Sequence, residues 1–479
     1  MKGNQFRFRI LALLCIALLA VAGGYGVYSV STYGSRWFSN VRNIRYQSAR
    51  DTVIPGDIID RNGIKLATTD TEGNRVYQSD KPSRCAVVHL LGDGEGYVAN
   101  GVESFQARYL LGFETTLTER TEDLVAGEKR RGDHVVLTVD SRLCTEAARA
   151  FTNHAETYNK AGAVVVMNYK TGEVLALVSL PIFDPTEITD VVKNSPLHPF
   201  WNRALQSTMP PGSTFKIVTA AAALENMPDA ETRVFTCTGA TKPAGAKGVI
   251  TDYGGEHHDS ITLPKAFRLS CNNTFAQMAL QMGDKNLRKT AENFGFNDNF
   301  LFQDMIVENS SYPTKNRTNF EIGWSGVGQS QVTATPMHMC LVAAAVANDG
   351  IMMEPRLIAG VQSPAGVVRY EFEPKVYRRA MKPETARVLQ GYMRTVVEAR
   401  DGTGTRAAIE GVPIAGKTGS AETSVDGRAV THAWFVGYID DDRYPYAVCV
   451  FVEEGGTGGK VAAPVAKDIF AYLLTNYTK

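Results

Sequence analysis

The segment Pro-Pro-Gly-Ser-Thr-Phe-Lys, residues 210–216, decides how the rest of this sequence is interpreted. Two prolines and a glycine interrupt the preceding chain, and an alanine-rich apolar pattern follows, which predicts a helix over Ser213–Leu224. Ser213 and Lys216 are three residues apart, so their side chains share one face of that helix. The helix N-terminus also offers free backbone N–H groups and a positive dipole end.

A serine paired with a lysine in this way can act as a nucleophile only under one condition. A serine hydroxyl needs a base beside it, and an ordinary lysine, with a pKa of about 10.4, is already protonated at neutral pH. Burial and nearby cations lower the pKa of an amine, so Lys216 must lie in a dry pocket, beside a second amine such as Lys417. The alternative is a helix-capping Ser213 with an exposed Lys216, and an isolated Ser-x-x-Lys usually means that.

Two further short motifs follow in the chain. They are Ser270-Cys271-Asn272 and Lys417-Thr418-Gly419-Ser420. Each motif is weak evidence by itself. Their presence together, in this order after Ser213 and Lys216, makes the capping alternative a poor explanation.

The three motifs resemble those of the penicillin-recognising serine transpeptidases and β-lactamases. The surrounding sequence is similar to that of class B penicillin-binding proteins over most of the chain. The matching segments are Gly56–Gly63, Asn202–Ala204 with 210–216, Gly328–Ser330 with Thr335–Pro336, Ala415–Glu422 and Ala433–Tyr438. The sequence departs from the family at Ser330, which replaces a glycine, and at Ser420, which replaces a threonine of many relatives and keeps the hydroxyl.

The resemblance implies a role for each motif residue. Ser213 is expected to be the acylated nucleophile and Lys216 its general base. Ser270 is expected to relay the proton toward the leaving amine, Asn272 to hold the substrate peptide, and Lys417 to complete the hydrogen-bonded network. No metal and no cofactor are implied.

The Lys-Thr-Gly-Ser motif is expected to bind substrate. Thr418 and Ser420, on either side of Gly419, would hold the terminal carboxylate of the donor peptide. The backbone N–H groups of Ser213 and Ser420 would form an oxyanion hole, in which one donor is typically worth about 3 kcal/mol.

The N-terminus predicts a membrane anchor. Three cationic residues within positions 1–9 precede an uncharged stretch, Ile10–Ser35, whose apolar part is long enough to cross about 30 Å of bilayer core. We therefore expect residues 1–9 in the cytoplasm, a transmembrane helix over 10–32, and the rest outside the cell membrane. The alternative is a signal peptide cleaved near Ala20–Ala22, which would also export the protein.

Length and composition indicate how many folded units the chain can form, and the net charge argues against nucleic acid as a partner. A chain of 479 residues that is 44% hydrophobic can form more than one folded unit. Lys plus Arg and Asp plus Glu are both 50, so the formal net charge is zero and there is no overall charge to attract nucleic acid.

The character of the sequence changes at about residue 140, which predicts a domain boundary there. Residues 33–140 are polar and turn-rich, and we expect a small non-catalytic pedestal domain with short strands at Ile58–Ile59, Ala86–Leu91 and His134–Val139. Residues 141–479 are expected to form the transpeptidase domain, so the fold class is α+β, with an antiparallel sheet flanked by helices.

The expected elements of the larger domain follow from its periodicity. Its strands are expected at Ala163–Met167, Val174–Leu180, His432–Ile439 and Tyr446–Val452. Its helices are expected at Ser141–Tyr158, Ser213–Leu224, Pro336–Ala347, Pro383–Ala399 and Ala462–Leu474.

Several other patterns are interpreted as structural. A second Lys-Thr-Gly, at 170–172, is expected in a hairpin turn. Glu454–Lys460 lacks the residues of a phosphate loop and is expected to be a flexible loop near the substrate groove. His257–Asp259 has no metal-ligand spacing and is expected to be a polar loop.

The seven cysteines contain no Cys-x-x-Cys pair and are expected to be mostly buried apolar residues. Trp324 and Trp434 could line the groove or pack in the core.

The function implied by the resemblance is D,D-transpeptidation of peptidoglycan stem peptides that end in D-Ala-D-Ala, with covalent inhibition by β-lactam antibiotics. The short segment between anchor and catalytic unit has no room for a glycosyltransferase domain, so a separate membrane glycan polymerase of the SEDS type is the expected partner. The alternatives are a D,D-carboxypeptidase or β-lactamase, in which water is the acceptor, and a non-enzymatic β-lactam sensor.

Overall fold

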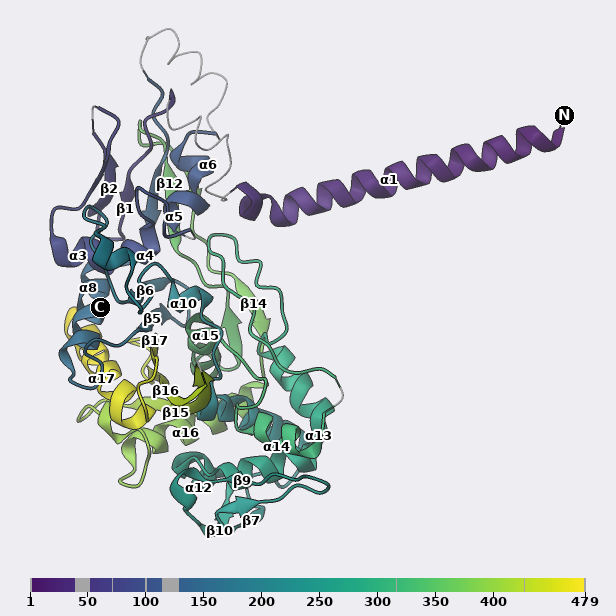
Figure 1. Cartoon of the computed structure of the whole chain (residues 1–479), viewed down its shortest axis with the longest axis vertical. Helices are drawn as coiled ribbons and strands as arrows, with labels where there is room; N and C mark the ends of the chain where they lie inside the picture. Colours follow the sequence, from purple (N-terminus) through teal and green to yellow (C-terminus); the bar gives the residue numbers. More distant parts are fainter. Residues whose placement is uncertain are drawn as a thin grey trace.

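The computed structural model describes residues 2–38, 52–70, 72–99, 101–113, 129–315, 317–425 and 427–477. Parts of the predicted pedestal, 39–51 and 114–128, therefore lie outside the described residues. Helix α1 (Lys2–Phe38) projects from the body of the molecule (Figure 1). Within it, Arg9–Ser31 is long and apolar enough to cross a membrane, by length and composition, and its side chains are mostly exposed.

The centre of the molecule is a five-stranded antiparallel sheet in the order β15-β16-β17-β5-β6. The strands are β5 (Gly162–Asn168), β6 (Val174–Leu180), β15 (Ile414–Val425), β16 (Arg428–Ile439) and β17 (Tyr446–Val452). Helices α8 (Ser141–Asn153) and α17 (Gly458–Asn476) pack together on this sheet, and α15 (Pro336–Ala347) contacts β5, β16 and β17 on its other side (Figure 1).

The predicted hairpin of the larger domain is confirmed. β5 pairs with β6 in antiparallel register, from Gly162 opposite Leu180 to Met167 opposite Val174. Both strands are buried almost throughout, which explains their unbroken apolar sequence. The second Lys-Thr-Gly lies in the turn between them, where Lys170 Nζ forms an ion pair with Asp442 at 3.3 Å near the surface.

A second sheet builds the pedestal, in the order β13-β12-β4-β1-β2-β3. Its strands are β1 (Ile58–Ile59), β2 (Lys65–Thr69), β3 (Arg75–Tyr77), β4 (His134–Leu137), β12 (Ile358–Gln362) and β13 (Val368–Glu371). β4 pairs in parallel with β1 and antiparallel with β12. The sheet is thus completed by residues from beyond position 140, so the two predicted domains share it.

One predicted strand is wrong. Ala86–Leu91 is helical, at the end of α3 (Lys81–Ala86) and in α4 (Val88–Leu91). The Asp80 carboxylate accepts from the Ser83 backbone N–H and so begins α3, and all four residues of α4 are buried. A short apolar run that is buried on every side has no periodicity to separate a strand from a helix.

Two of the remaining helices, which begin at Lys216 and Pro383, lie close to where the sequence predicts them. The other remaining helices and strands, and β15 of the central sheet, are not among the predicted elements. The helices are α11 (Lys216–Asn226), α12 (Leu263–Leu269), α13 (Asn272–Asn293), α14 (Asn319–Gly326) and α16 (Pro383–Glu398), with short helices α5 (Val102–Phe105), α6 (Ala107–Leu110), α9 (Asp190–Lys193) and α10 (Arg203–Gln206). The remaining strands are β7 (Val234–Cys237), β8 (Ala240–Thr241), β9 (Ile250–Thr251), β10 (Asp259–Thr262), β11 (Ile351–Met353) and β14 (Val376–Arg379).

Candidate active site

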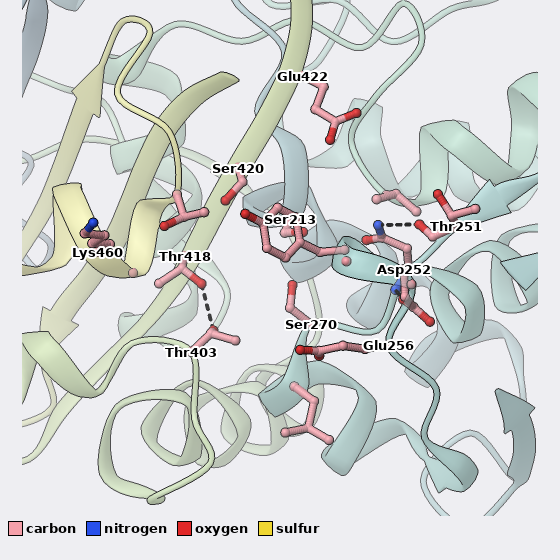
Figure 2. A pocket seen from close by; sticks show the side chains of 18 of the residues that line it. Ser213, Thr251, Asp252, Glu256, Ser270, Thr403, Thr418, Ser420, Glu422 and Lys460 are labelled. Atoms are coloured by element: carbon pink, nitrogen blue, oxygen red, sulfur yellow. Dashed lines mark hydrogen bonds between the residues drawn. The ribbon is translucent and has the colours of Figure 1, made fainter. Parts of the chain in front are cut away.

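A cavity of about 710 Å³ brings the three motifs together (Figure 2). It lies between strand β15 and the helices that carry Ser213 and Ser270. Ser213, Ser270, Asn272, Thr418 and Ser420 all line it. Residues more than 200 positions apart in the chain therefore face one space. Lys216 and Lys417 are fully buried beneath this surface, and buried Gly419 lies between Thr418 and Ser420 on β15.

Ser213, the predicted nucleophile, lies in a tighter turn than the sequence predicts. Ser213 is in a 3₁₀ helix, Gly212–Phe215, and α11 begins only at Lys216. Gly212 has a φ of +53°, and a Cβ atom there would lie 2.9 Å from the Ser420 carbonyl oxygen. Glycine is therefore required for this left-handed turn and for its close approach to β15.

Lys216 is surrounded by oxygens. Its Nζ donates to the Ser270 carbonyl, to Ser270 Oγ at 3.2 Å and to Asn272 Oδ1 at 2.7 Å. Burial lowers the pKa of Lys216 to about 8, although the nearby ionisable groups of Cys271 and Asp252 act in the opposite direction. A lysine with this pKa has an appreciable neutral fraction near neutral pH, as a general base requires.

Ser270 connects the two buried lysines. It ends α12 in a left-handed conformation, with φ of 61°, and α13 begins at Asn272. Lys417 Nζ donates to Ser270 Oγ at 2.9 Å. Burial, together with the positive charge of Lys216, holds the pKa of Lys417 well below its ordinary value.

The opposite wall of the cavity is polar and cationic. Thr418 Oγ1 lies 2.7 Å from Thr403 Oγ1, and Ser420 Oγ accepts from the Gly458 backbone N–H at 3.4 Å. Arg406 and Lys460 also line the cavity. Hydroxyl groups beside cationic side chains can hold a carboxylate by charge-assisted hydrogen bonds.

β15 is the edge strand of the central sheet, so its outer backbone groups are available to a peptide. One nearby side chain already uses this edge. In the amide orientation that satisfies both groups, Gln329 donates to the Glu422 carbonyl at 3.1 Å and accepts from the Glu422 N–H at 2.9 Å. Gln329 thereby fixes the far end of the strand that carries Thr418 and Ser420.

Sequence reasoning missed some cavity residues and placed others. Thr403 and Arg406 belong to no motif, and only the fold brings them to Thr418. The expected position of the Glu454–Lys460 segment near the groove is confirmed, because Thr457, Gly459 and Lys460 line the cavity. Of the two tryptophans, Trp324 lines the cavity and Trp434 is buried in the core.

Known proteins are similar to this chain in sequence and in fold. Residues 162–471 match the family model of the penicillin-binding protein transpeptidase domain. The peptidoglycan D,D-transpeptidase PbpA of Mycolicibacterium smegmatis is 32% identical over 401 residues, which cover 79% of this chain and 80% of that protein. PbpA of Mycobacterium tuberculosis is 32% identical over 381 residues, 74% of this chain and 75% of that protein.

A solved structure has a similar fold over most of this chain. Penicillin-binding protein A from M. tuberculosis, in a penicillin G acyl-enzyme complex, has a TM-score of 0.78 and 30% sequence identity, over 88% of this chain and 99% of that one. The family match covers well over half of the sequence, and these relatives share most of their length with it. The chain therefore belongs to the penicillin-binding protein transpeptidase family, as a class B member.

Proposed function

We propose that this protein is a peptidoglycan D,D-transpeptidase that cross-links stem peptides through an acyl-enzyme on Ser213. The observation that carries the proposal is the shared Ser270 hydroxyl, which lies within hydrogen-bond distance of two buried lysines at the cavity that holds Ser213. Relatives of similar sequence and fold are named D,D-transpeptidases, and one is captured as a penicillin acyl-enzyme.

In the first step the Ser213 oxygen attacks the carbonyl carbon of the penultimate D-alanine. Neutral Lys216 takes the hydroxyl proton, and the new ester bond forms as the amide C–N bond breaks. The departing D-alanine amine needs a proton. Ser270 can deliver one, because its hydroxyl contacts both Lys216 and Lys417 and can receive a proton from either.

The transition state carries negative charge on the carbonyl oxygen. We propose that the backbone N–H groups of Ser213 and Ser420 stabilise that charge. Gly212 supports this arrangement, because its left-handed turn brings the Ser213 turn against β15 at Ser420. Because packing already holds these backbone N–H groups in place, they need little rearrangement when the negative charge develops.

Groups on the other side of the cavity are proposed to orient the substrate. Thr418 and Ser420 are proposed to bind the terminal carboxylate of the donor, with Arg406 and Lys460 supplying positive charge nearby. The peptide would run along the free edge of β15, and Asn272 would hold its backbone from the facing side. An amine of a second stem peptide then attacks the ester and releases Ser213.

The choice of acceptor separates this function from its rivals. A carboxypeptidase or β-lactamase must activate water against the ester. Glu308-Asn309 is the nearest sequence match to the water-positioning segment of class A β-lactamases, and Glu308 lies at the surface, outside the described cavity lining. A long-lived penicillin adduct is therefore expected. A non-enzymatic sensor would form that adduct too, but it would not join two peptides.

We also propose a membrane location and a partner. Arg9–Ser31 would cross the cell membrane once, with the cationic N-terminus in the cytoplasm and the catalytic unit outside. The pedestal would act as a spacer and would dock a SEDS-type glycan polymerase, which supplies the strands to be cross-linked. Co-purification of the polymerase from detergent with the full-length chain and with an anchor-swapped form, but not with a form altered on the pedestal surface, would support the docking role.

The decisive experiment uses the full-length protein in detergent. Fluorescent penicillin should label one serine, and peptide mass mapping should place it at Ser213. S213A should lose the label while keeping the unfolding transition of the wild type, and S424A, an exposed serine on the same strand as Ser420, should keep it. Formation of a cross-linked dimer from two stem peptides would separate a transpeptidase from a sensor. A mapped adduct at another residue would disprove the mechanism.

A further inference from the structure

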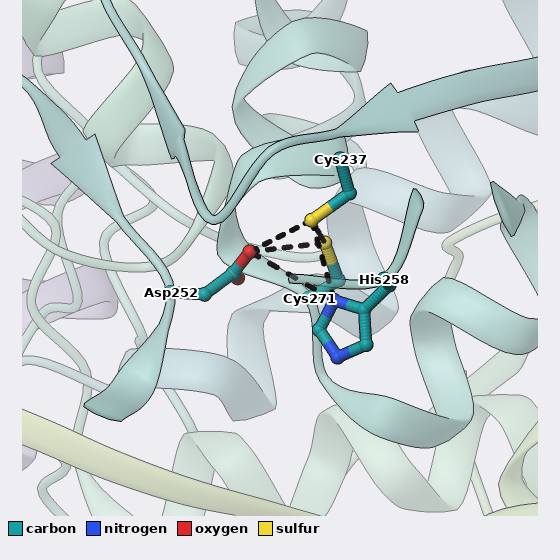
Figure 3. A group of neighbouring side chains, drawn as sticks. All are labelled: Cys237, Asp252, His258 and Cys271. Atoms are coloured by element: carbon teal, nitrogen blue, oxygen red, sulfur yellow. Dashed lines mark hydrogen bonds and ion pairs between the residues drawn. The ribbon is translucent and has the colours of Figure 1, made fainter. Parts of the chain in front are cut away.

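Four metal-ligand side chains converge behind the Ser270–Asn272 turn (Figure 3). Cys237 ends β7, Asp252 precedes the 3₁₀ turn Tyr253–Gly255, and His258 precedes β10. Cys271 lies between α12 and α13. One ligand atom from each residue lies within 4.8 Å of the other three.

Five of the six separations between the ligand atoms lie between 3.1 and 3.9 Å, close to the edges of a tetrahedral site. Cys237 Sγ lies 3.1 Å from Asp252 Oδ2, 3.3 Å from His258 Nδ1 and 3.4 Å from Cys271 Sγ. Asp252 Oδ2 lies 3.4 Å from Cys271 Sγ and 3.9 Å from His258 Nδ1. Around zinc, with Zn–S of about 2.3 Å and Zn–N or Zn–O of about 2.0–2.1 Å, the edges of a tetrahedron are about 3.3–3.8 Å.

The chemistry of the set also selects the ion. Two thiols with an imidazole and a carboxylate favour Zn²⁺ over magnesium or calcium, which prefer oxygen ligands. Cys237, Asp252 and Cys271 are buried, and the His258 side chain is only 11% exposed, although Asp252 and His258 also border the active-site cavity. We propose that Cys237, Asp252, His258 and Cys271 hold a structural zinc ion.

The surroundings orient the four ligands. The Cys271 sulfur accepts from the Thr274 backbone N–H at 3.3 Å, a bond that a thiolate ligand also accepts. His258 turns its other nitrogen, Nε2, toward the Glu256 carboxylate at 4.0 Å. Hydrogen bonds and carboxylates around the ligands commonly fix them in metal sites.

The zinc site is built into the catalytic motif. Cys271 is the residue between Ser270 and Asn272. The second Asp252 oxygen, Oδ1, accepts from the backbone N–H of Asn272 and from that of Asn273, the latter at 3.2 Å. An ion bound to Cys271 Sγ and Asp252 Oδ2 therefore fixes the backbone that directly follows the left-handed Ser270 turn. The four ligands act as positioning residues for Ser270 and Asn272, and this part of the inference rests on the proposed function.

The zinc site cannot be predicted from the sequence, because its ligands come from four separate segments. Cys237 and Asp252 are 15 positions apart, and no two ligands have the short spacing of a zinc finger or a helical His pair. The inference thus revises the expectation that His257–Asp259 is only a polar loop and that no metal is bound. Only the folded chain brings His258 to two cysteines.

The first experiment measures metal in the full-length protein, purified in detergent without chelators. Elemental analysis should find about one zinc per chain, and zinc X-ray absorption should show two sulfur and two nitrogen or oxygen ligands. C237A should lose most of the zinc, whereas C144A, which removes another buried cysteine outside the cluster, should keep it. A wild-type protein that takes up no zinc even from added ZnCl₂, or that contains a Cys237–Cys271 disulfide, would overturn the proposal.

The second experiment tests the positioning role on the wild type, so it does not depend on a variant that folds. Chelation should slow penicillin acylation by about tenfold, and added zinc should restore it, in proportion to the metal bound. D252N should show the same loss without full recovery. Unchanged acylation in fully zinc-free protein would refute positioning. Zinc binding without any acylation would instead count against the proposed function and leave the metal site intact.

Discussion

The Ser270 hydroxyl oxygen lies 2.9 Å from the side-chain nitrogen of Lys417, a residue 147 positions away in the chain. The same hydroxyl lies 3.2 Å from Lys216 Nζ. Two buried amines that share one hydroxyl repel each other when both are charged, so one of them gives up its proton more easily. In the proposed mechanism, this contact allows one lysine to act as the base and the other to supply a proton.

The first prediction concerns pH. Acylation needs the neutral form of Lys216, whose pKa burial lowers to about 8. The second-order rate constant for penicillin should therefore rise about tenfold per pH unit below that value and level off above it. K216R should lose acylation, because a guanidinium cannot give up its proton in a protein. Stopped-flow labelling across pH 5.5–10 measures both effects, and a flat profile would assign the base elsewhere.

The second prediction compares two lysines with the same local sequence. Lys417 and Lys170 each begin a Lys-Thr-Gly, but Lys417 is fully buried at Ser270 and Lys170 lies in an exposed hairpin turn. K417M should reduce acylation by about 10²-fold or more, because it removes a group from the proton pathway. K170M should change it by less than about twofold. Equal losses would mean that the lysines act through stability, which thermal unfolding would reveal.

The third prediction tests the approach of the Ser213 turn to β15. Gly212 and Gly411 both have positive φ, but only at Gly212 would a Cβ atom meet Ser420. Each change to alanine should cost about 1 kcal/mol or more of unfolding free energy. G212A should also slow acylation at least tenfold by moving Ser213, whereas G411A should leave it unchanged. Similar acylation in both variants would show that the close approach is not needed.

The fourth prediction concerns a residue outside every motif. Thr403 Oγ1 lies 2.7 Å from Thr418 Oγ1, a hydroxyl proposed to bind the donor carboxylate. T403V removes a neutral hydrogen bond worth about 1 kcal/mol, so penicillin acylation should fall about fivefold. T405V, at an exposed position of the same cavity, is the control and should have little effect. A wild-type rate in T403V would remove Thr403 from the binding site.

The fifth prediction concerns the departure from the family at Ser330. This serine has a φ of +66°, a conformation that costs a non-glycine residue about 1–2 kcal/mol. S330G should therefore raise the unfolding free energy by up to about 1 kcal/mol. S424G, at an exposed strand position without positive φ, should lower it by a similar amount. Destabilisation by S330G would mean that the hydroxyl makes a necessary contact.

The structure brings the three predicted motifs to one cavity, and the sequence could place their residues because short local motifs carry them. Ser213 and Lys216 lie within one turn, and the hairpin of β5 and β6 follows from two apolar runs around a glycine turn. Such patterns need only local geometry. The 3₁₀ form of the Ser213 turn was not predictable, because it depends on contact between Gly212 and β15, a strand about 200 residues away.

What the sequence could not predict depends on long-range packing. Thr403 reaches Thr418, and Cys237 reaches Cys271, only after helices and strands from distant segments have assembled. Ala86–Leu91 is likewise helical where its composition suggested a strand, because a run buried on all faces has no periodicity that separates the two. In each case the deciding partner lies outside any sequence window that local propensity covers.

The shared pedestal sheet has a mechanical consequence. β4 and β12 are joined by four register pairs, from Ile358 opposite Leu137 to Gln362 opposite His134. The hydrogen bonds of an antiparallel pair run across the strands, so tension along them loads all of the bonds together rather than one at a time. A force that pulls β4 along its length would therefore be passed to β12, and so to the part of the chain beyond residue 140, through all of these bonds at once.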